Sequence, residues 1–201
     1  ASGTAEPGQI LGVTFTNKAA REMVERVAEL IGTQGRQVTL GSFHAVSMMI
    51  LRRHAVAAGM AGPDFQILDD DEQRQLVDGA IRELGLVDAS EPAKKRRSRA
   101  KAVHARIMAF KEEGWDVAEA ARNFVPEGPA EEGAIEVYQA YEAALARRNA
   151  ADFPDLILKT VRLFQARPDI KAMWAGKFSH VLVDEFQDTN TLQYRWLEHL
   201  A

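Results

Sequence analysis

The segment VLVDEFQDTN, at residues 181–190, places acidic side chains directly after an apolar run. The run Val181–Val183 is typical of a central parallel strand, and Asp184 and Glu185 follow at the end where such sheets place ligands. Mg²⁺ prefers one or two carboxylates, with waters and phosphate oxygens in its other positions. Asp184 is therefore a candidate Mg²⁺ ligand and Glu185 a candidate base for an attacking water, although acids after a strand can also simply cap the next helix.

A nucleotide hydrolase also needs a loop that holds the phosphates, and the sequence contains no GxxxxGK[ST] motif. Gly3 and Gly8 have the spacing of its two glycines, but glutamine and isoleucine follow in place of the lysine and the hydroxyl. The pair Gly176–Lys177 has Lys171 in place of the first glycine, and phenylalanine follows it. We therefore expect the phosphate loop to belong to a longer protein, of which this chain is a piece cut just after that loop.

Two strand-and-helix units stand near the start of the chain. Ile10–Phe15 is an apolar run of strand length, and Ala19–Ile31 follows with apolar residues at the spacing of one helical face. Asn17 can cap that helix. Gln37–Leu40 and Phe43–Ala58 repeat the pattern of strand and helix. Two such units in succession predict an α/β domain with a parallel sheet.

From about residue 60 the pattern changes to one helix after another. The expected helices are Asp71–Leu84, roughly Lys94–Lys111, Val117–Asn123 and Glu132–Arg148. A helical stripe at Phe153–Phe164 follows, then a third sheet strand at His180–Val183 and a closing helix at Thr191–Leu200, capped by Asn190. The sequence therefore predicts a sheet domain made of residues 1–58 and 150–201, with an inserted helical subdomain at 59–149.

The composition indicates an ordinary soluble protein, with 46% hydrophobic residues among 201. There is no cysteine, and the five histidines lack zinc-ligand spacing, so we expect no disulfide and no structural metal. No apolar run approaches the roughly 18 residues of a membrane span. The N-terminal segment ASGTAEPGQ lacks the basic start and apolar middle of a signal peptide, so we expect a cytoplasmic protein without membrane contact.

The net charge of −4 does not advertise nucleic-acid binding, but the charge is uneven. One segment is rich in cations, which continue at Arg106 and Lys111, so one surface is expected to be locally basic. The cations of this segment are Lys94, Lys95, Arg96, Arg97, Arg99 and Lys101. Such a run is often a solvated helix face, and it can also contact phosphates. The acids at Asp69–Glu72 are interpreted as a capping box and not as a cation site.

Four segments resemble motifs of the UvrD/Rep-type superfamily 1 DNA helicases. They are TFTNKAA at Thr14–Ala20, SFHAV at Ser42–Val46, DFPDLI at Asp152–Ile157 and DEFQDTN at Asp184–Asn190. They occur in the family's order, with the helical stretch where that family inserts its 1B subdomain. The resemblance covers essentially the whole chain. It implies a RecA-like α/β fold of the P-loop NTPase type, incomplete here, whose first domain (1A) is interrupted by 1B.

The resemblance implies ATP-driven 3′ to 5′ translocation on single-stranded DNA with strand separation, in DNA repair or replication. Asp184 resembles the family's Mg²⁺ ligand and Glu185 its water-activating base, while Gln187 and Asp188 resemble groups that link the nucleotide site to neighbouring motifs. ATP and Mg²⁺ are expected to act in the longer protein. The fragment alone is expected to be inactive and to bind neither tightly.

The resemblance also implies DNA contacts. Phe15, Thr16 and Asn17 resemble the loop that touches single-stranded DNA, and Ser42 and His44 a second contact to the DNA backbone. An aromatic ring offers any base a stacking face, and short polar groups reach phosphates. Without the motif, Phe15 at a strand end would be interpreted as a core residue. The basic segment lies where the family approaches duplex DNA, so its cations are candidate contacts near a junction of single and double strands.

The chain departs from the family pattern at several positions. Ser42 and Ala45 stand where the family usually has threonine and serine, which weakens the expected backbone contact. Pro154 replaces an acid, and proline is tolerated in the first helical turn after a cap at Asp152.

Three other functions are consistent with these residues. The chain could come from a helicase-nuclease subunit of RecB or AddA type, which shares the motifs. It could be a non-enzymatic DNA-binding or interaction module, which the missing phosphate loop favours. It could also be a metal-dependent nuclease that uses Asp184, Glu185 and Asp188, cutting DNA with Mg²⁺ and without ATP. No residue pattern identifies a protein partner.

Overall fold

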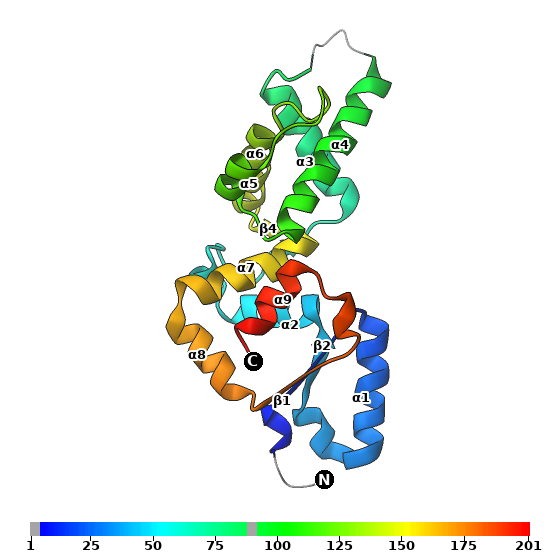
Figure 1. Cartoon of the computed structure of the whole chain (residues 1–201), viewed down its shortest axis with the longest axis vertical. Helices are drawn as coiled ribbons and strands as arrows, with labels where there is room; N and C mark the ends of the chain where they lie inside the picture. The colour runs from blue at the N-terminus through cyan, green and yellow to red at the C-terminus, as the bar shows by residue number, and fades with distance from the viewer. Residues whose placement is uncertain (1–4, 88–91) are drawn as a thin grey trace. The chain divides into compact units, whose positions relative to one another are not determined.

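The computed structural model of the chain describes residues 5–87 and 92–201. Gly3, which has the spacing of a phosphate-loop glycine, lies outside these residues. The chain divides into two compact units (Figure 1). The α/β unit contains the chain up to Gly59 and from Leu156 onward, and the helical unit is Met60–Asp155.

The α/β unit is built on a parallel sheet. Its strands are β1 (Ile10–Thr14), β2 (Thr39–Ser42) and β5 (His180–Val183), in the order β2-β1-β5. In the register, Gly12 of β1 lies opposite Leu40 of β2 and Leu182 of β5. The prediction that these strands share one parallel sheet is confirmed, and the fold is α/β, consistent with an incomplete RecA-like sheet.

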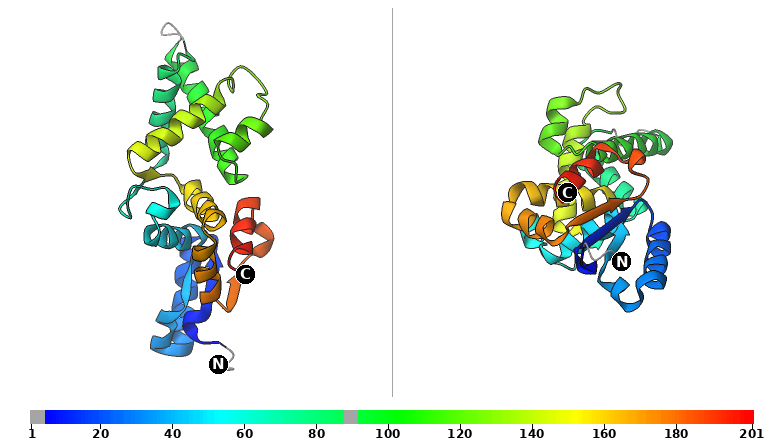
Figure 2. Two further views of the ribbon diagram at one scale, coloured as in Figure 1. Left: turned by 90° about the vertical axis from the view of Figure 1, so that its left-hand side faces the viewer. Right: turned by 60° about the horizontal axis from the view of Figure 1, so that its bottom comes forward.

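The helices of the α/β unit are α1 (Asn17–Ile31), α2 (Phe43–Arg53), α7 (Phe153–Ala166, which begins in the helical unit), α8 (Pro168–Lys177) and α9 (Thr191–Glu198). Helices α1, α2 and α9 follow the strands β1, β2 and β5, and α7 and α8 precede β5. Short 3₁₀ turns occupy Pro7–Gln9, Gly32–Gln37, Val56–Ala58 and Phe186–Asp188. Figure 2 shows α1 on one side of the strands and α8 on the other.

The two faces of β1 differ in what they contact. Leu11 and Val13 are buried in the main apolar core, together with side chains of α2, α7, α8 and α9. Gly12 points to the opposite face, where a Cβ would lie 2.5 Å from a Leu40 methyl carbon and 3.1 Å from the Met23 sulfur. Because a side chain at that position would collide, glycine lets α1 approach the sheet closely.

The helical unit contains α3 (Asp70–Glu83), α4 (Ala93–Glu112), α5 (Val117–Asn123) and α6 (Ala134–Arg147). Each was predicted to within a few residues. Two short strands, β3 (Gln66–Ile67) and β4 (Ala150–Ala151), pair in parallel near the points where the chain enters and leaves the unit. The capping box at Asp69 is confirmed, since Asp69 accepts the Glu72 N–H and Glu72 accepts the Asp69 N–H.

Several element boundaries differ from the prediction. The helix expected at Phe43–Ala58 ends at Arg53, and a separate turn leads to Gly59, whose φ of 78° suits glycine. Gln37 belongs to a 3₁₀ turn and not to β2. Helix α8 was not predicted; Pro168 stands in its first turn, where proline is tolerated. None of the helices in the described ranges is long and apolar enough to cross a membrane.

Candidate functional site

The loops that follow β1, β2 and β5 leave the sheet at one edge, because the strands are parallel. Thr14 is in register with Ser42, and Val13 with Val183. The backbone N–H of Asp184 still donates to the carbonyl of Val13, at 3.0 Å. The candidate residues on these loops are therefore gathered at one sheet edge; they are Phe15, Thr16, Asn17, Ser42, His44, Asp184, Glu185, Gln187 and Asp188.

A side-chain hydrogen bond joins the first two loops. The Ser42 hydroxyl donates to Asn17 Oδ1 at 2.8 Å and accepts the Ala45 N–H at 3.3 Å, so Ser42 also caps α2. The expected cap of α1 at Asn17 is wrong. Thr16 has the extended conformation of a cap and accepts the Ala19 N–H, whereas Asn17 is already the first helical residue.

Phe15 lies between the core and the surface. Its ring is partly buried and meets the buried Phe43 edge to face, with centroids 5.6 Å apart, and Phe43 meets Trp196 in the same way at 5.5 Å. The core fixes the position of the Phe15 ring while part of the ring stays accessible. This arrangement suits a stacking platform, because a fixed ring loses little freedom when a base lies on it.

His44 is the second residue of α2 and is half-buried. Burial lowers the pKa of its imidazole below the usual 6.5. The side chain is therefore mostly neutral at neutral pH. A contact from His44 to a DNA phosphate would be a hydrogen bond from a neutral ring and not an ion pair.

The two adjacent acids of β5's loop are exposed, and neither carboxylate has a hydrogen bond or ion pair with any described residue. Glu185 has φ 52° and ψ 42°, the left-handed conformation that only Asn149 shares among the described non-glycine residues. Such a residue costs about 1–2 kcal/mol relative to a right-handed one. Backbone strain of this kind is often kept where function requires it.

The following helix does not use these acids as a cap. Asn190 accepts the Gln193 N–H at 2.8 Å, and the Gln193 side chain accepts the Asn190 N–H at 3.1 Å, which completes a capping box. The predicted cap at Asn190 is confirmed. The alternative explanation of Asp184 and Glu185 as helix caps is therefore excluded.

Two pockets flank β5. One, of about 420 Å³, is lined by Ala19, Glu22, Met23, Arg26, Leu182, Val183 and Asp184. The other, of about 390 Å³, is lined by Val181, Val183, Phe186, Tyr194, Leu197, Glu198 and Ala201. The first has a carboxylate of the candidate site on its wall. A ligand at the sheet edge would have room beside Asp184 on the α1 side.

The predicted basic segment forms the first half of α4, in the helical unit. Arg99 donates to the Glu132 carbonyl at 2.8 Å, and so has a structural contact. Arg97 and Lys101 border a pocket of about 610 Å³ that Asp71 and Asp78 of α3 also line. The surface is therefore mixed in charge. Lys111 is not part of it, because its side chain is fully buried.

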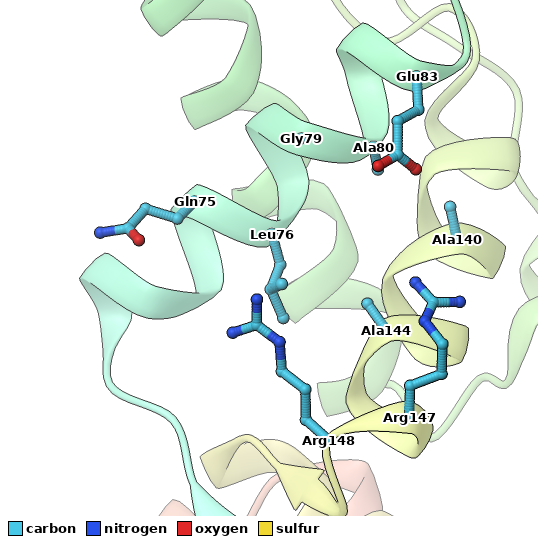
Figure 3. A pocket seen from close by; sticks show the side chains of 9 residues that line it. All are labelled: Gln75, Leu76, Gly79, Ala80, Glu83, Ala140, Ala144, Arg147 and Arg148. Atoms are coloured by element: carbon cyan, nitrogen blue, oxygen red, sulfur yellow. The ribbon is translucent and has the colours of Figure 1, made fainter.

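A pocket between α3 and α6 carries two arginines that the sequence did not single out (Figure 3). It measures about 340 Å³ and is lined by Gln75, Leu76, Gly79, Ala80, Glu83, Ala140, Ala144, Arg147 and Arg148. The hollow forms because small residues of both helices face each other. Arg147 is the last residue of α6 and Arg148 follows it, and cations at a helix C-terminus are favoured by the helix dipole.

Comparison with known proteins identifies the family. The model of the UvrD/REP helicase N-terminal domain matches residues 1–201. The ATP-dependent DNA helicase PcrA of Leuconostoc citreum is 40% identical over 97% of this chain, and DNA helicase II of Escherichia coli (strain K12) is 36% identical over 97%. The ATP-dependent DNA helicase UvrD1 of Mycobacterium bovis is 38% identical over 96%.

The matches cover 25%, 26% and 24% of those relatives, so the chain spans about a quarter of their length. Match, motif order and sheet-edge geometry agree, and the chain belongs to the UvrD/REP helicase N-terminal domain family.

Proposed function

We propose that this chain forms part of the first RecA-like domain, with its 1B insertion, of an ATP-dependent motor that moves 3′ to 5′ along single-stranded DNA. We assign the motor to DNA repair or replication. The observation that carries the proposal is the meeting of three loops at one sheet edge: the acidic turn after β5 and the loops after β1 and β2. Family membership supports it, since relatives are named as ATP-dependent DNA helicases.

The donor set of the acidic turn fits Mg²⁺. Asp184 offers an exposed carboxylate, without a protein partner among the described residues, on the wall of a pocket. Bound Mg²⁺ would neutralise charge on the phosphates of ATP. We assign Glu185, which lies in a left-handed turn beside Asp184, to accept the proton of an attacking water. Gln187 donates to Asp188 at 3.4 Å, and we assign both to coupling between the nucleotide and the DNA.

The neighbouring loops would hold the DNA. Phe15 supplies a ring for base stacking, and Thr16, Asn17, Ser42 and His44 supply short polar groups for the backbone. The cations of α4's first half are candidate contacts to duplex DNA at a junction.

The isolated chain should lack DNA-stimulated ATPase activity. Hydrolysis needs the phosphates held, the metal bound and the water aligned together, and the 201 residues contain no GxxxxGK[ST] loop. The same absence favours one second candidate, a non-catalytic DNA-binding module. ATP hydrolysis by residues 1–201 alone would contradict this assignment of roles.

The decisive experiment uses a longer protein that joins this chain to a phosphate loop and a second RecA-like domain. Glu185→Gln should still bind ATP but lose most DNA-stimulated turnover, because an amide keeps the shape and cannot accept the proton. Glu25→Gln, the same change on the exposed face of α1, is the matched control and should hydrolyse ATP normally. Near-normal turnover in Glu185→Gln would remove that residue from the role of base.

A DNA-cleavage assay on the same variants distinguishes a metal-dependent nuclease from the proposed helicase. Cleavage of DNA with Mg²⁺ and no ATP, lost in Asp184→Asn, would favour it. The helicase proposal expects intact DNA and an Asp184→Asn variant with a weakened dependence of ATP hydrolysis on Mg²⁺.

A further inference from the structure

Lys111 is a buried cation that the proposed DNA and nucleotide sites do not use. The sequence suggested an exposed basic residue, and the structure corrects this: its side chain is 0% exposed. Lys111 follows Val103 and Ile107 at intervals of four residues, so it lies on the buried face of α4. That spacing is the signal by which sequence could have found it.

The ammonium group of Lys111 meets carboxylates from two other helical segments. Its Nζ lies 2.6 Å from Asp152 Oδ2, 2.8 Å from Asp155 Oδ1 and 2.6 Å from Glu142 Oε1. An ammonium has three N–H donors, so each donor can face one carboxylate. Glu142 belongs to α6, while Asp152 and Asp155 stand at the start of α7. The four residues are called the Lys111 cluster below.

Asp152 contacts both the first turn of α7 and residues of α4 and α6. Its Oδ1 accepts the Asp155 N–H at 2.9 Å, which caps the first turn of α7 as predicted. Its Oδ2 accepts both the Lys111 ammonium and the Tyr141 hydroxyl, the latter at 2.9 Å. The cap of α7 is therefore bonded directly to residues of α4 and α6.

The charges of the cluster do not balance, since three carboxylates face one ammonium. Burial and Asp155 raise the pKa of Asp152 to about 6, against the opposing effect of Lys111. Burial by itself would lower the pKa of Lys111, but Asp155, Asp152 and Glu142 together raise it well above its usual value. Lys111 therefore stays charged across the physiological range.

The other titratable groups around Lys111 stay neutral or act weakly. Tyr138 and Tyr141 of α6 place their rings 5.8 Å and 5.0 Å from the ammonium, and burial raises the pKa of both phenols, so both remain protonated. His104, also on α4, has a pKa lowered first by burial and in part by the Lys111 charge. Lys111 is thus a permanent cation that contacts all three carboxylates of the cluster.

We propose that Lys111 is a positioning residue that fixes the first turn of α7 to α4 and α6, and that it does so through its charge and not through its bulk. Removal of one partner of a buried ion pair is far more damaging than replacement of both partners by well-packed apolar groups. The reason is that the charge left behind stays buried without compensation. The inference concerns the fold of residues 1–201 and does not depend on the proposed helicase role, so each can fail without the other.

The first test is Lys111→Met, which keeps the length of the side chain and removes its charge. Hydrogen exchange of the Asp155 amide is measured by NMR in the whole chain, as protection relative to the unfolded rate at each pH. At about pH 8 the variant should lose more than about tenfold in protection, because the buried carboxylates of Asp152 and Asp155 lose the ammonium that both contact. At about pH 5.5 the loss should shrink, because the pKa of Asp152 is raised to about 6 and a protonated Asp152 carboxyl needs no cation. Lys101→Met, an exposed lysine of the same helix, should match the parent at both pH values.

Each outcome decides the point. No loss at either pH would mean that Lys111 acts through its bulk, which methionine keeps. Equal loss at both pH values, or failure to fold at both, would mean that uncompensated carboxylate charge is not the cause. Either result would overturn the proposal. Failure to fold near pH 8 with recovery near pH 5.5 would support it.

A second variant, Asp152→Asn, keeps the shape of the side chain and supplies one oxygen in place of two. Its NH₂ group must face either the Lys111 ammonium or the Asp155 N–H, so one of the two contacts is lost. The Asp155 amide should again lose more than about tenfold in protection near pH 8. Protection equal to the parent's would overturn the inference.

Discussion

The Ser42 hydroxyl donates a 2.8 Å hydrogen bond to Oδ1 of Asn17 and so joins the loop after β2 to the first turn of α1. Both residues belong to segments that resemble DNA-contacting motifs. The bond gives the sheet edge a fixed geometry in the absence of DNA. A contact surface set in advance loses less freedom when a ligand binds.

Ser42→Ala should destabilise the α/β unit by about 1–2 kcal/mol, because it removes the cap of α2 together with the bond to Asn17. The measurement is urea unfolding of the whole chain. Ser98→Ala, on the exposed face of α4, should change stability little. An unfolding free energy for Ser42→Ala equal to the parent's would show that the bond contributes nothing net.

Phe15→Ala should weaken binding of single-stranded DNA by about 1–3 kcal/mol if a base stacks on the ring. Binding by the isolated chain should be weak and should fall steeply with salt, so a low-salt fluorescence titration is the suitable assay. Leu30→Ala is the control, because Leu30 is an 82% exposed apolar residue near the end of α1. Unchanged DNA affinity in Phe15→Ala would assign the ring to the core alone.

At position 185 a glycine variant should be more stable than an alanine variant, which is the reverse of the usual order of stability within a helix. At its φ of 52°, Glu185→Gly should be more stable than Glu185→Ala by about 1 kcal/mol, because glycine has no Cβ to clash in the left-handed region. At Glu25, within α1, alanine should be the more stable by about 1 kcal/mol. Thermal unfolding of the four variants measures both differences, and the same order at both positions would contradict a left-handed Glu185.

Acid should destabilise the chain in part through His44. Burial lowers the pKa of His44 in the folded state, so the unfolded state binds the proton more tightly. The contribution of neutral His44 to stability is fully present above the pKa of the unfolded state, near 6.5. It is lost as the pH falls from there through the lower pKa of His44 in the folded state. An NMR titration should place the His44 midpoint below 6.5. A midpoint above that value would reverse the sign of the expected effect.

The sequence predicted the parts of the fold that depend on local pattern. Short apolar runs located β1 and β5, and the capping box at Asp69 and the cap at Asn190 were visible as residue types before a helix. The choice between Thr16 and Asn17 as cap was not visible, because both residue types cap helices. In the structure Thr16 accepts the Ala19 N–H, whereas Asn17 accepts the Ser42 hydroxyl. The motif resemblance supplied most of the candidate site.

Contacts between residues far apart along the chain could not be predicted from local sequence patterns. Lys111 was placed on the surface because lysine is rarely buried, and the carboxylates that compensate it come from residues 31, 41 and 44 positions away along the chain. The strain at Glu185 was also invisible, since glutamate has no preference for a left-handed turn.

The parallel pairing of β3 with β4 sets Gln66 beside Ala150, so the helical unit begins and ends at neighbouring points. Adjacent strands lie roughly 5 Å apart, which a very short linker can span. A polypeptide of residues 60–155 would thus have its two ends close together, the arrangement in which circular permutation and domain insertion are tolerated. Length can be added to or removed from this unit during evolution without lengthening the path of the chain through the sheet.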